Sequence, residues 1–274
     1  MTRRPPPCAL LIDLDGVLFQ GDRPLPGAAR LLGRLAGRPH CFLTNNPIRT
    51  PEQIAAACVA MGLPAPDPRC ILTSALATAR WLARERPGLR YFAVGGGGLE
   101  AALSAVGSRD DRHANVVVVG EGVGLDYATL TTGINLILGQ GARLVATNPD
   151  TTVDGVLDGR RVVLPGCGAL VAPFTAATGV TPTFIGKPEP LLYEMALEQL
   201  GCPAASCLMI GDRPDTDIAG AERLGIWTAL VRTGRFPPGR GWVAGLPRPD
   251  LDVPDLDHLI EALDRAFPGL LAPL

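Results

Sequence analysis

A short apolar run that ends in two acidic residues constrains the fold of this chain more than any other feature. Residues 9–12 are apolar, and Asp13, Asp15 and Gly16 follow within four positions. Four apolar residues are too few for a helix and suit a strand that is buried on both faces of a parallel sheet. Because open α/β sheets bind ligands at the carboxyl ends of their strands, we expect both acids at such an edge.

The two carboxylates also predict a cation. If the strand continues regularly, its period of two places Asp13 and Asp15 on one face, and Gly16 permits the sharp turn that follows. Two anions this close repel each other unless a cation joins them, and oxygen ligands favour a hard divalent metal, most economically Mg²⁺. Taken alone, the motif leaves a second interpretation open, namely a strand end with a solvated Asp-x-Asp-Gly turn.

The rest of the chain alternates short β-rich runs with helical patterns, which is typical of a parallel α/β sheet. Outside the middle of the chain, the strand-like runs are residues 40–43, 70–72, 183–185, 207–210 and 227–231. Helical patterns lie between them and close the chain, at residues 26–36, from 51 onward, 75–84, 190–200 and around 256–263. The sequence therefore predicts the α/β class.

The middle of the chain is predicted to be an inserted domain. Residues 85–182 contain their own alternation of strands and helices, between a first core segment, 1–84, and a second, 183–274. Four consecutive glycines, residues 95–98, suggest a dinucleotide-binding loop, but Glu100 stands where the third glycine of G-x-G-x-x-G belongs. A tight turn is the favoured interpretation of that stretch.

Composition excludes several classes of partner. A net charge of −2 gives no electrostatic reason to expect nucleic acid or an anionic membrane. No apolar run approaches the ~20 residues that a membrane span needs. The seven cysteines are scattered without a C-x-x-C pair, which is typical of reduced thiols in a cytoplasmic protein.

One basic residue stands out because it is the only lysine. Lysine and arginine together number 25, and Lys187 is the sole lysine among them. A lysine is a compact point charge that can bridge a carboxylate and a phosphoryl oxygen, for which the wide planar fork of arginine is less suited. The alternative is a single surface lysine without a role.

Two further strand ends carry polar residues. Thr44, Asn45 and Asn46 follow the 40–43 run just before a helix, where a hydroxyl and backbone amides can form a phosphate site or an ordinary capped turn. Asp212, after Gly211, supplies a third carboxylate for the metal at the end of the 207–210 run. Asp217 is placed either to support the site or to cap the next helix.

In this order and spacing, the four polar segments resemble the motifs of haloacid dehalogenase (HAD) superfamily phosphatases, specifically the NagD-like branch with its p-nitrophenylphosphatase and phosphoglycolate phosphatase members. They read Asp13-Leu14-Asp15-Gly16-Val17, Thr44-Asn45-Asn46, Gly186-Lys187-Pro188 and Gly211-Asp212-Arg213-Pro214-Asp215-Thr216-Asp217. The similarity covers nearly the whole chain. It implies a Rossmann-like core with an inserted type II α/β cap.

The resemblance also implies a phosphatase mechanism. Asp13 would be the nucleophile that forms an aspartyl-phosphate, and Asp15 the general acid and then the general base. Mg²⁺ would be held by Asp13, the backbone carbonyl of Asp15, and Asp212.

The remaining motif residues would bind the substrate. Thr44 and the amides of Asn45 and Asn46 would hold the phosphoryl oxygens. Lys187 would screen Asp13 from the incoming anion. Gly16, Gly211 and Asp217 would support the site.

By the same resemblance, the cap residues that face the substrate lie at 149–155. The candidates there are Asp150, Thr151, Thr152 and Asp154. This loop contains no arginine and no aromatic residue, which disfavours a dedicated nucleotide or pyridoxal phosphatase. Sugar, polyol or glycolate phosphates are the expected substrates, with nucleotides as a further option. Residues 120–124 depart from the family pattern Val-Gly-x-Asp, which leaves the cap geometry there open.

The expected partner is therefore a small phosphate ester, with a homodimer through the cap as a further option. Two alternative functions remain: a phosphomutase on the same core, and a non-catalytic protein that binds a phosphorylated metabolite. Haloacid dehalogenation needs no acid two residues after the nucleophile, so the presence of Asp15 favours phosphoryl chemistry.

Overall fold

A computed structural model describes residues 4–157 and 159–272, and it confirms the predicted α/β class with parallel sheets. The chain forms two compact units. Unit 1 consists of Met1–Thr44, Pro51–Leu72 and Lys187–Leu274. Unit 2 consists of Asn45–Thr50 and Thr73–Gly186. The predicted boundaries between segments, at residues 84 and 182, stay predictions. Residues 1–3, 158 and 273–274 of the predicted segments lie outside the described part of the chain.

Unit 1 is built on a six-stranded sheet of order β15-β14-β13-β1-β4-β5. Its strands are β1 (Ala9–Asp13), β4 (His40–Thr44), β5 (Ile71–Thr73), β13 (Cys207–Gly211), β14 (Trp227–Val231) and β15 (Leu251–Val253). The central strand β1 runs parallel to β13 and to β4, and Ile12 pairs with Ile210 and Phe42. Every residue of β1 and β13 is buried, as the uninterrupted apolar runs require.

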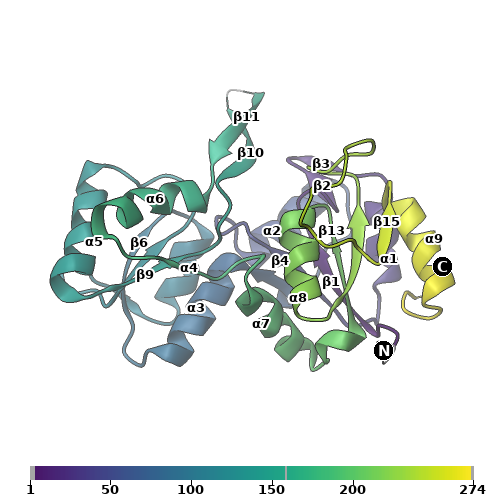
Figure 1. Cartoon of the computed structure of the whole chain (residues 1–274), viewed down its shortest axis with the longest axis horizontal. Coiled ribbons are helices and arrows are strands. Elements are labelled where there is room, and N and C mark those ends of the chain that lie inside the picture. The colour runs from purple at the N-terminus through teal and green to yellow at the C-terminus, as the bar shows by residue number, and fades with distance from the viewer. Residues whose placement is uncertain (1–3, 158, 273–274) are drawn as a thin grey trace. The chain divides into compact units, whose positions relative to one another are not determined.

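Helices cover both faces of this sheet. The helices of unit 1 are α1 (Ala28–Arg34), α2 (Pro51–Ala60), α7 (Pro190–Leu200), α8 (Ala219–Arg223) and α9 (Leu256–Ala266). Alternate strand residues such as Leu10 and Ile12 pack in one cluster with α1, α2 and α9. Helices α7 and α8 lie on the near side of the sheet in Figure 1. Short elements complete the unit: β2 (Phe19–Gln20), β3 (Arg23–Pro24), η1 (Pro68–Cys70), η2 (Ala204–Ser206) and the π-helical turn η3 (Pro214–Ile218).

Unit 2 has a separate five-stranded sheet of order β12-β9-β8-β6-β7 whose paired strands all run parallel. The strands are β6 (Arg90–Val94), β7 (Ser108–Arg109), β8 (Val116–Val119), β9 (Arg143–Ala146) and β12 (Thr183–Phe184). Because β12 pairs with β9, the strand that precedes Lys187 belongs to this sheet. Unit 1 resumes at Lys187, whereas the sequence predicts that the second core segment begins at residue 183.

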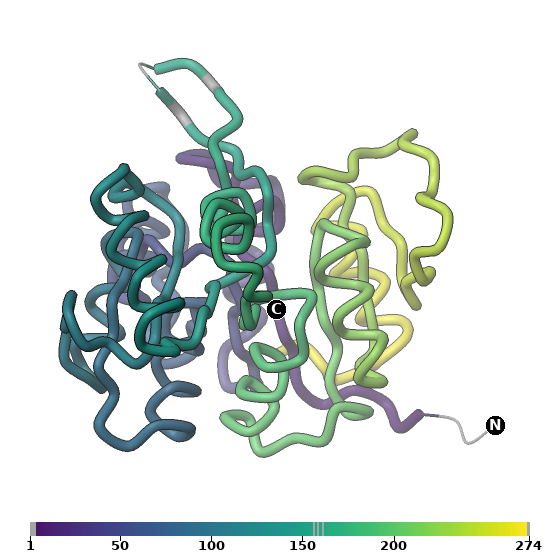
Figure 2. The backbone as a smooth tube through the Cα atoms, turned by 60° about the vertical axis from the view of Figure 1, so that its left-hand side comes forward, coloured from purple at the N-terminus to yellow at the C-terminus, as the bar shows by residue number. Residues whose placement is uncertain are grey.

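The helices of unit 2 are α3 (Ser74–Glu85), α4 (Gly98–Ser104), α5 (Tyr127–Gln140) and α6 (Cys167–Thr178). Side chains of α5 and α6 share one core cluster with β6, β8 and β9. The antiparallel hairpin of β10 (Thr152–Leu157) and β11 (Arg160–Pro165) projects from the rest of unit 2 in Figure 2. Among the described residues, no helix has the length and apolar character needed to cross a bilayer.

Candidate active site

Three carboxylates meet at the carboxyl edge of the unit 1 sheet. Asp13 is the last residue of β1, Asp212 follows β13, and Asp217 lies in η3. One carboxylate oxygen of each lies within 4.8 Å of the others, and all three residues are buried. The parallel pairing of β1 with β13 brings Asp13 and Asp212 together, since both strands end at the same edge.

Lys187 is the cation of this cluster. Its Nζ lies 2.7 Å from Asp13 Oδ1 and 2.8 Å from Asp217 Oδ1, and it donates a hydrogen bond of 3.3 Å to the Leu43 carbonyl. Only 3% of its side chain is exposed, so the alternative of a surface lysine is wrong. Asp217 does not cap α8, whose N-cap is Ile218; its Oδ2 accepts instead the backbone N–H of Arg213.

Burial and the neighbouring charges raise the pKa values of Asp13, Asp212 and Lys187 above their usual ranges. Burial, reinforced by the carboxylates of Asp217 and Asp212, raises the pKa of Asp13 well above its usual range, although Lys187 opposes the shift. Burial, with Asp217 nearby, raises the pKa of Asp212 to about 7. Burial alone would lower the pKa of Lys187, but the charges of Asp13 and Asp217 outweigh it and raise that pKa.

The Asp212 carboxylate packs closely against the backbone of two glycines. A Cβ on Gly16, which has φ +82°, would lie 2.5 Å from Asp212 Oδ2, and a Cβ on Gly234 would lie 2.0 Å from the same oxygen. The backbone N–H of Arg235 donates to Asp212 Oδ2 at 2.8 Å. Gly211 likewise leaves room for Asp217, whose Cγ would lie 2.3 Å from an added Cβ.

The donor set of this cluster fits a divalent metal. Asp212 Oδ1 is buried and has no hydrogen-bond partner among the described residues, although a buried polar atom is normally satisfied. The ligand atoms are carboxylate oxygens, which Mg²⁺ prefers. Asp13 and Asp212 can hold the ion, whereas Asp217 is already engaged by Lys187 and Arg213.

The other predicted residues of unit 1 lie beside this cluster. Asp15 is exposed just after β1 and forms an isolated bridge with Phe19, and the Gly16 N–H donates to the Phe19 carbonyl at 2.7 Å. This closes the turn that Gly16 was predicted to permit. Thr44 is buried at the end of β4, the strand next to β1.

Asn45 and Asn46 belong to unit 2, although they follow Thr44 directly. Asn45 Nδ2 donates to Asp150 Oδ2 at 2.7 Å, and its carbonyl accepts from Asn148 Nδ2 at 2.7 Å and from Ser74 Oγ at 2.6 Å. Asn46 Oδ1 accepts the backbone N–H of Ile48 at 2.8 Å, which shapes the turn before α2. The Asn46 side chain thus bonds to backbone within unit 2, and the Asn45 side chain bonds to a carboxylate there.

Sequence reasoning missed two members of this network. Asn148 and Glu121 are both buried, and Asn148 Nδ2 donates to Glu121 Oε1 at 2.9 Å. The departure from the family pattern at 120–124 was the signal that pointed to Glu121. The pattern could not indicate its partner, because the two residues lie on different strand ends of the unit 2 sheet.

The candidate cap-loop residues differ in their surroundings. Asp150 is buried and bonded to Asn45, whereas Thr151, Thr152 and Asp154 are exposed. Thr152 and Asp154 belong to β10, so the predicted loop is in part a strand. The β-branched residues at 152 and 153 suit that conformation.

Family models match two parts of the chain. The model described as haloacid dehalogenase-like hydrolase matches residues 10–109, and a related HAD-hydrolase-like model matches residues 184–259. The two matches include all the acids of the cluster and Lys187.

Named proteins match almost the full length. An acid sugar phosphatase from Staphylococcus saprophyticus is 37% identical over 261 residues, which cover 94% of this chain and 98% of that protein. NagD from Escherichia coli K-12 has a TM-score of 0.82 at 30% identity and covers 92% of this chain and 97% of its own. A glycerol phosphate phosphatase from Mycobacterium tuberculosis, solved in complex with magnesium, has a TM-score of 0.82 at 33% identity, covering 92% of this chain and 76% of that one.

Proposed function

This chain belongs to the haloacid dehalogenase-like hydrolases, and from that premise we propose that it is a Mg²⁺-dependent phosphatase that acts through an aspartyl-phosphate. It is a hydrolase of phosphoric monoester bonds, with small phosphate esters as substrates. The observation that carries the proposal is the buried pairing of Lys187 with Asp13 beside a second carboxylate, Asp212.

We assign the attack on phosphorus to the Asp13 carboxylate. A bond forms between its oxygen and phosphorus while the bond from phosphorus to the alcohol oxygen breaks. Lys187 reduces the repulsion between this carboxylate and the incoming anion, which for two unit charges at 4 Å is ~4 kcal/mol at an effective dielectric of ~20. Asp217 keeps Lys187 in place from its other side.

Asp15 is assigned the proton transfers. Its exposed position just beyond β1 is accessible to a leaving alcohol, to which it gives a proton as the first bond breaks. A water molecule then attacks the aspartyl-phosphate and loses a proton to Asp15, which releases inorganic phosphate and restores Asp13. The hydrogen bond from the Gly16 N–H to the Phe19 carbonyl closes the turn that follows Asp15 and fixes the backbone there.

Mg²⁺ would be held by Asp13, Asp212 and the Asp15 carbonyl, and when bound it neutralises charge on the transferring phosphoryl group. Thr44 and the amides of Asn45 and Asn46 are assigned to the phosphoryl oxygens. Sugar, polyol and glycolate phosphates are the proposed substrates, and the relatives named for acid sugar and glycerol phosphates support the first two.

Phosphate release from a panel of such esters, with and without Mg²⁺, tests the proposal. We expect turnover only with the metal, loss of turnover in Asp13→Asn with the fold retained, and a phosphate adduct on Asp13 after acid quenching. Isomerised ester in place of free phosphate would indicate a phosphomutase, and binding without turnover a non-catalytic protein. Substantial activity of Asp13→Asn would exclude Asp13 as the nucleophile.

Two further expectations belong with this proposal. A homodimer through unit 2 is tested by light scattering of the purified protein. A cytoplasmic location rests on the chemistry of the seven cysteines, all of which are free thiols in the structure.

A further inference from the structure

A basic pocket lies in unit 1 beside the acidic cluster. Its volume is about 360 Å³, within the usual range of ~300–1,000 Å³ for small-molecule sites. It is lined by Arg213, Pro214, Asp215, Arg235, Phe236, Arg240, Val243 and Leu246. Arg213 precedes η3, and the lining residues from Arg235 onward come from the segment between β14 and β15.

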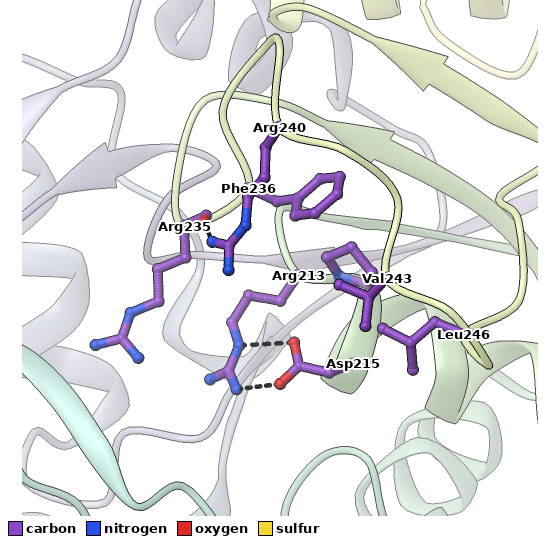
Figure 3. Close-up of a pocket in the computed structure, with 8 residues that line it drawn as sticks. Arg213, Asp215, Arg235, Phe236, Arg240, Val243 and Leu246 are labelled. Atoms are coloured by element: carbon purple, nitrogen blue, oxygen red, sulfur yellow. Dashed lines mark hydrogen bonds and ion pairs between the residues drawn. The ribbon is translucent and has the colours of Figure 1, made fainter.

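The two sides of the pocket differ in chemistry. Figure 3 shows the guanidinium groups of Arg213, Arg235 and Arg240 on one side and the side chains of Val243 and Leu246 on the other. The lining contains three guanidinium groups and one carboxylate, that of Asp215, so it carries an excess of positive charge. The chain as a whole has a net charge of −2, so this excess is local.

The guanidinium groups of Arg213 and Arg240 are held in place before any ligand binds. Arg213 forms a double hydrogen bond with Asp215, at 2.7 and 3.2 Å. Arg240 donates to the Arg235 carbonyl at 2.8 Å and lies 5.4 Å from the ring centre of the buried Phe236. Preorganised donors lose little conformational entropy on binding, and arginine forks suit carboxylate and phosphate oxygens.

The backbone of the same residues forms the wall of the acidic cluster. The Arg235 N–H donates to Asp212 Oδ2 at 2.8 Å, and the Arg213 N–H donates to Asp217 Oδ2 at 3.0 Å. The pocket residues Arg213 and Arg235 are therefore joined through their backbone directly to the carboxylates of the acidic cluster. A ligand bound at the cluster can extend a second group toward these arginines.

We propose that this pocket is a subsite for a second anionic group on the substrate, a carboxylate or phosphate remote from the transferred phosphoryl group. The proposal rests on the phosphatase function proposed above. It predicts a preference for small phosphate esters that carry a second anionic group. The loop at 149–155 contains no arginine and therefore offers no guanidinium group for such a substrate.

A matched pair of substrates tests this inference. Glycerol 3-phosphate and 3-phosphoglycerate differ by a hydroxymethyl group against a carboxylate. We expect the intact protein to have the higher kcat/KM for 3-phosphoglycerate. In Arg240→Ala and Arg235→Ala we expect the ratio of the two kcat/KM values to fall about tenfold, mainly because these variants bind 3-phosphoglycerate with a higher KM.

Arg265→Ala is the matched control, because Arg265 is exposed on α9 and does not line the pocket. We expect it to leave the ratio unchanged. An unchanged ratio in both pocket variants, in an enzyme that turns over both esters, would overturn the subsite alone. Absence of turnover of any ester would instead overturn the proposed function.

Added sulfate distinguishes a subsite from an independent anion site. At constant ionic strength, we expect sulfate to compete with 3-phosphoglycerate more strongly in the intact protein than in Arg240→Ala. If Arg240→Ala weakens inhibition by sulfate to the same extent with glycerol 3-phosphate as with 3-phosphoglycerate, the pocket binds a separate anion and the assignment to the substrate is wrong.

Discussion

Asn45 Nδ2 donates a hydrogen bond of 2.7 Å to Asp150 Oδ2, and both residues belong to unit 2. Asp150 is buried, and its own N–H donates to Asn148 Oδ1 at 3.0 Å. Within this unit, the residue that the sequence suggested for substrate contact thus engages a residue predicted to bind the phosphoryl group. We expect Asp150 to act by positioning Asn45.

Substitution of Asp150 tests that relationship. A hydrogen bond to a charged group contributes ~1.5–3 kcal/mol, so Asp150→Ala is expected to lower kcat/KM about tenfold or more. Asp150→Asn, which keeps an acceptor oxygen, should recover part of the loss. Asp111→Ala, a change at an exposed acid of the same unit that pairs with Arg109, is the control. Equal losses at 150 and 111, or no recovery by asparagine, would contradict positioning through Asn45.

Lys187 is expected to stabilise the folded protein as well as to assist turnover. Lys187→Met removes the cation that two buried carboxylates share, and the loss of one partner of a buried ion pair costs about 3–5 kcal/mol. We expect urea unfolding of the metal-free variant to show a free energy of unfolding that is lower by this amount than that of the unaltered protein. Added Mg²⁺ should restore part of the stability but little of the activity. A midpoint equal to that of the unaltered protein would show that the pairs contribute nothing net.

Gly234 is expected to be needed for the position of Asp212. A Cβ at this residue would lie 2.0 Å from Asp212 Oδ2, so Gly234→Ala must displace the carboxylate or the backbone. Overpacking of this kind costs about 1–3 kcal/mol, and we expect a fall in both thermal stability and the affinity for Mg²⁺. Gly241→Ala, in the same segment with no atom within 4 Å of the added Cβ, is the matched control. Normal metal affinity in Gly234→Ala would contradict the assignment.

The binding of Mg²⁺ can be measured by its effect on Tm. A ligand that binds only the folded state stabilises it by ~2.7 kcal/mol at a concentration of 100 times its Kd, which for a chain of this size raises Tm by several degrees. We expect Mg²⁺ to raise Tm of the intact protein and to have little effect on Asp212→Asn. Asp255→Asn, an N-cap change in α9 remote from the cluster in sequence, should keep the shift. A retained shift in Asp212→Asn would place the metal elsewhere.

Much of the fold was predictable because the signals are local. The apolar runs that became β1 and β4 end at Asp13 and Thr44, Asp212 follows the run that became β13, and their order along the chain indicated a shared sheet edge. The solitary lysine was identified by counting alone. The strand before Lys187 has only two residues, Thr183 and Phe184, which carry too little pattern to indicate the sheet to which they belong.

The sequence by itself indicated the reaction class through the resemblance of its strand-end motifs to those of HAD phosphatases, because residue types and their spacing are properties of a local pattern. Only the tertiary structure decided which charges meet. The pairing of Lys187 with Asp13 and Asp217, the bond from Asn45 to Asp150, and the gathering of Arg213 with Arg235 and Arg240 join residues far apart in the chain. Their energies depend on burial and distance, which the folded backbone sets and a linear pattern does not contain.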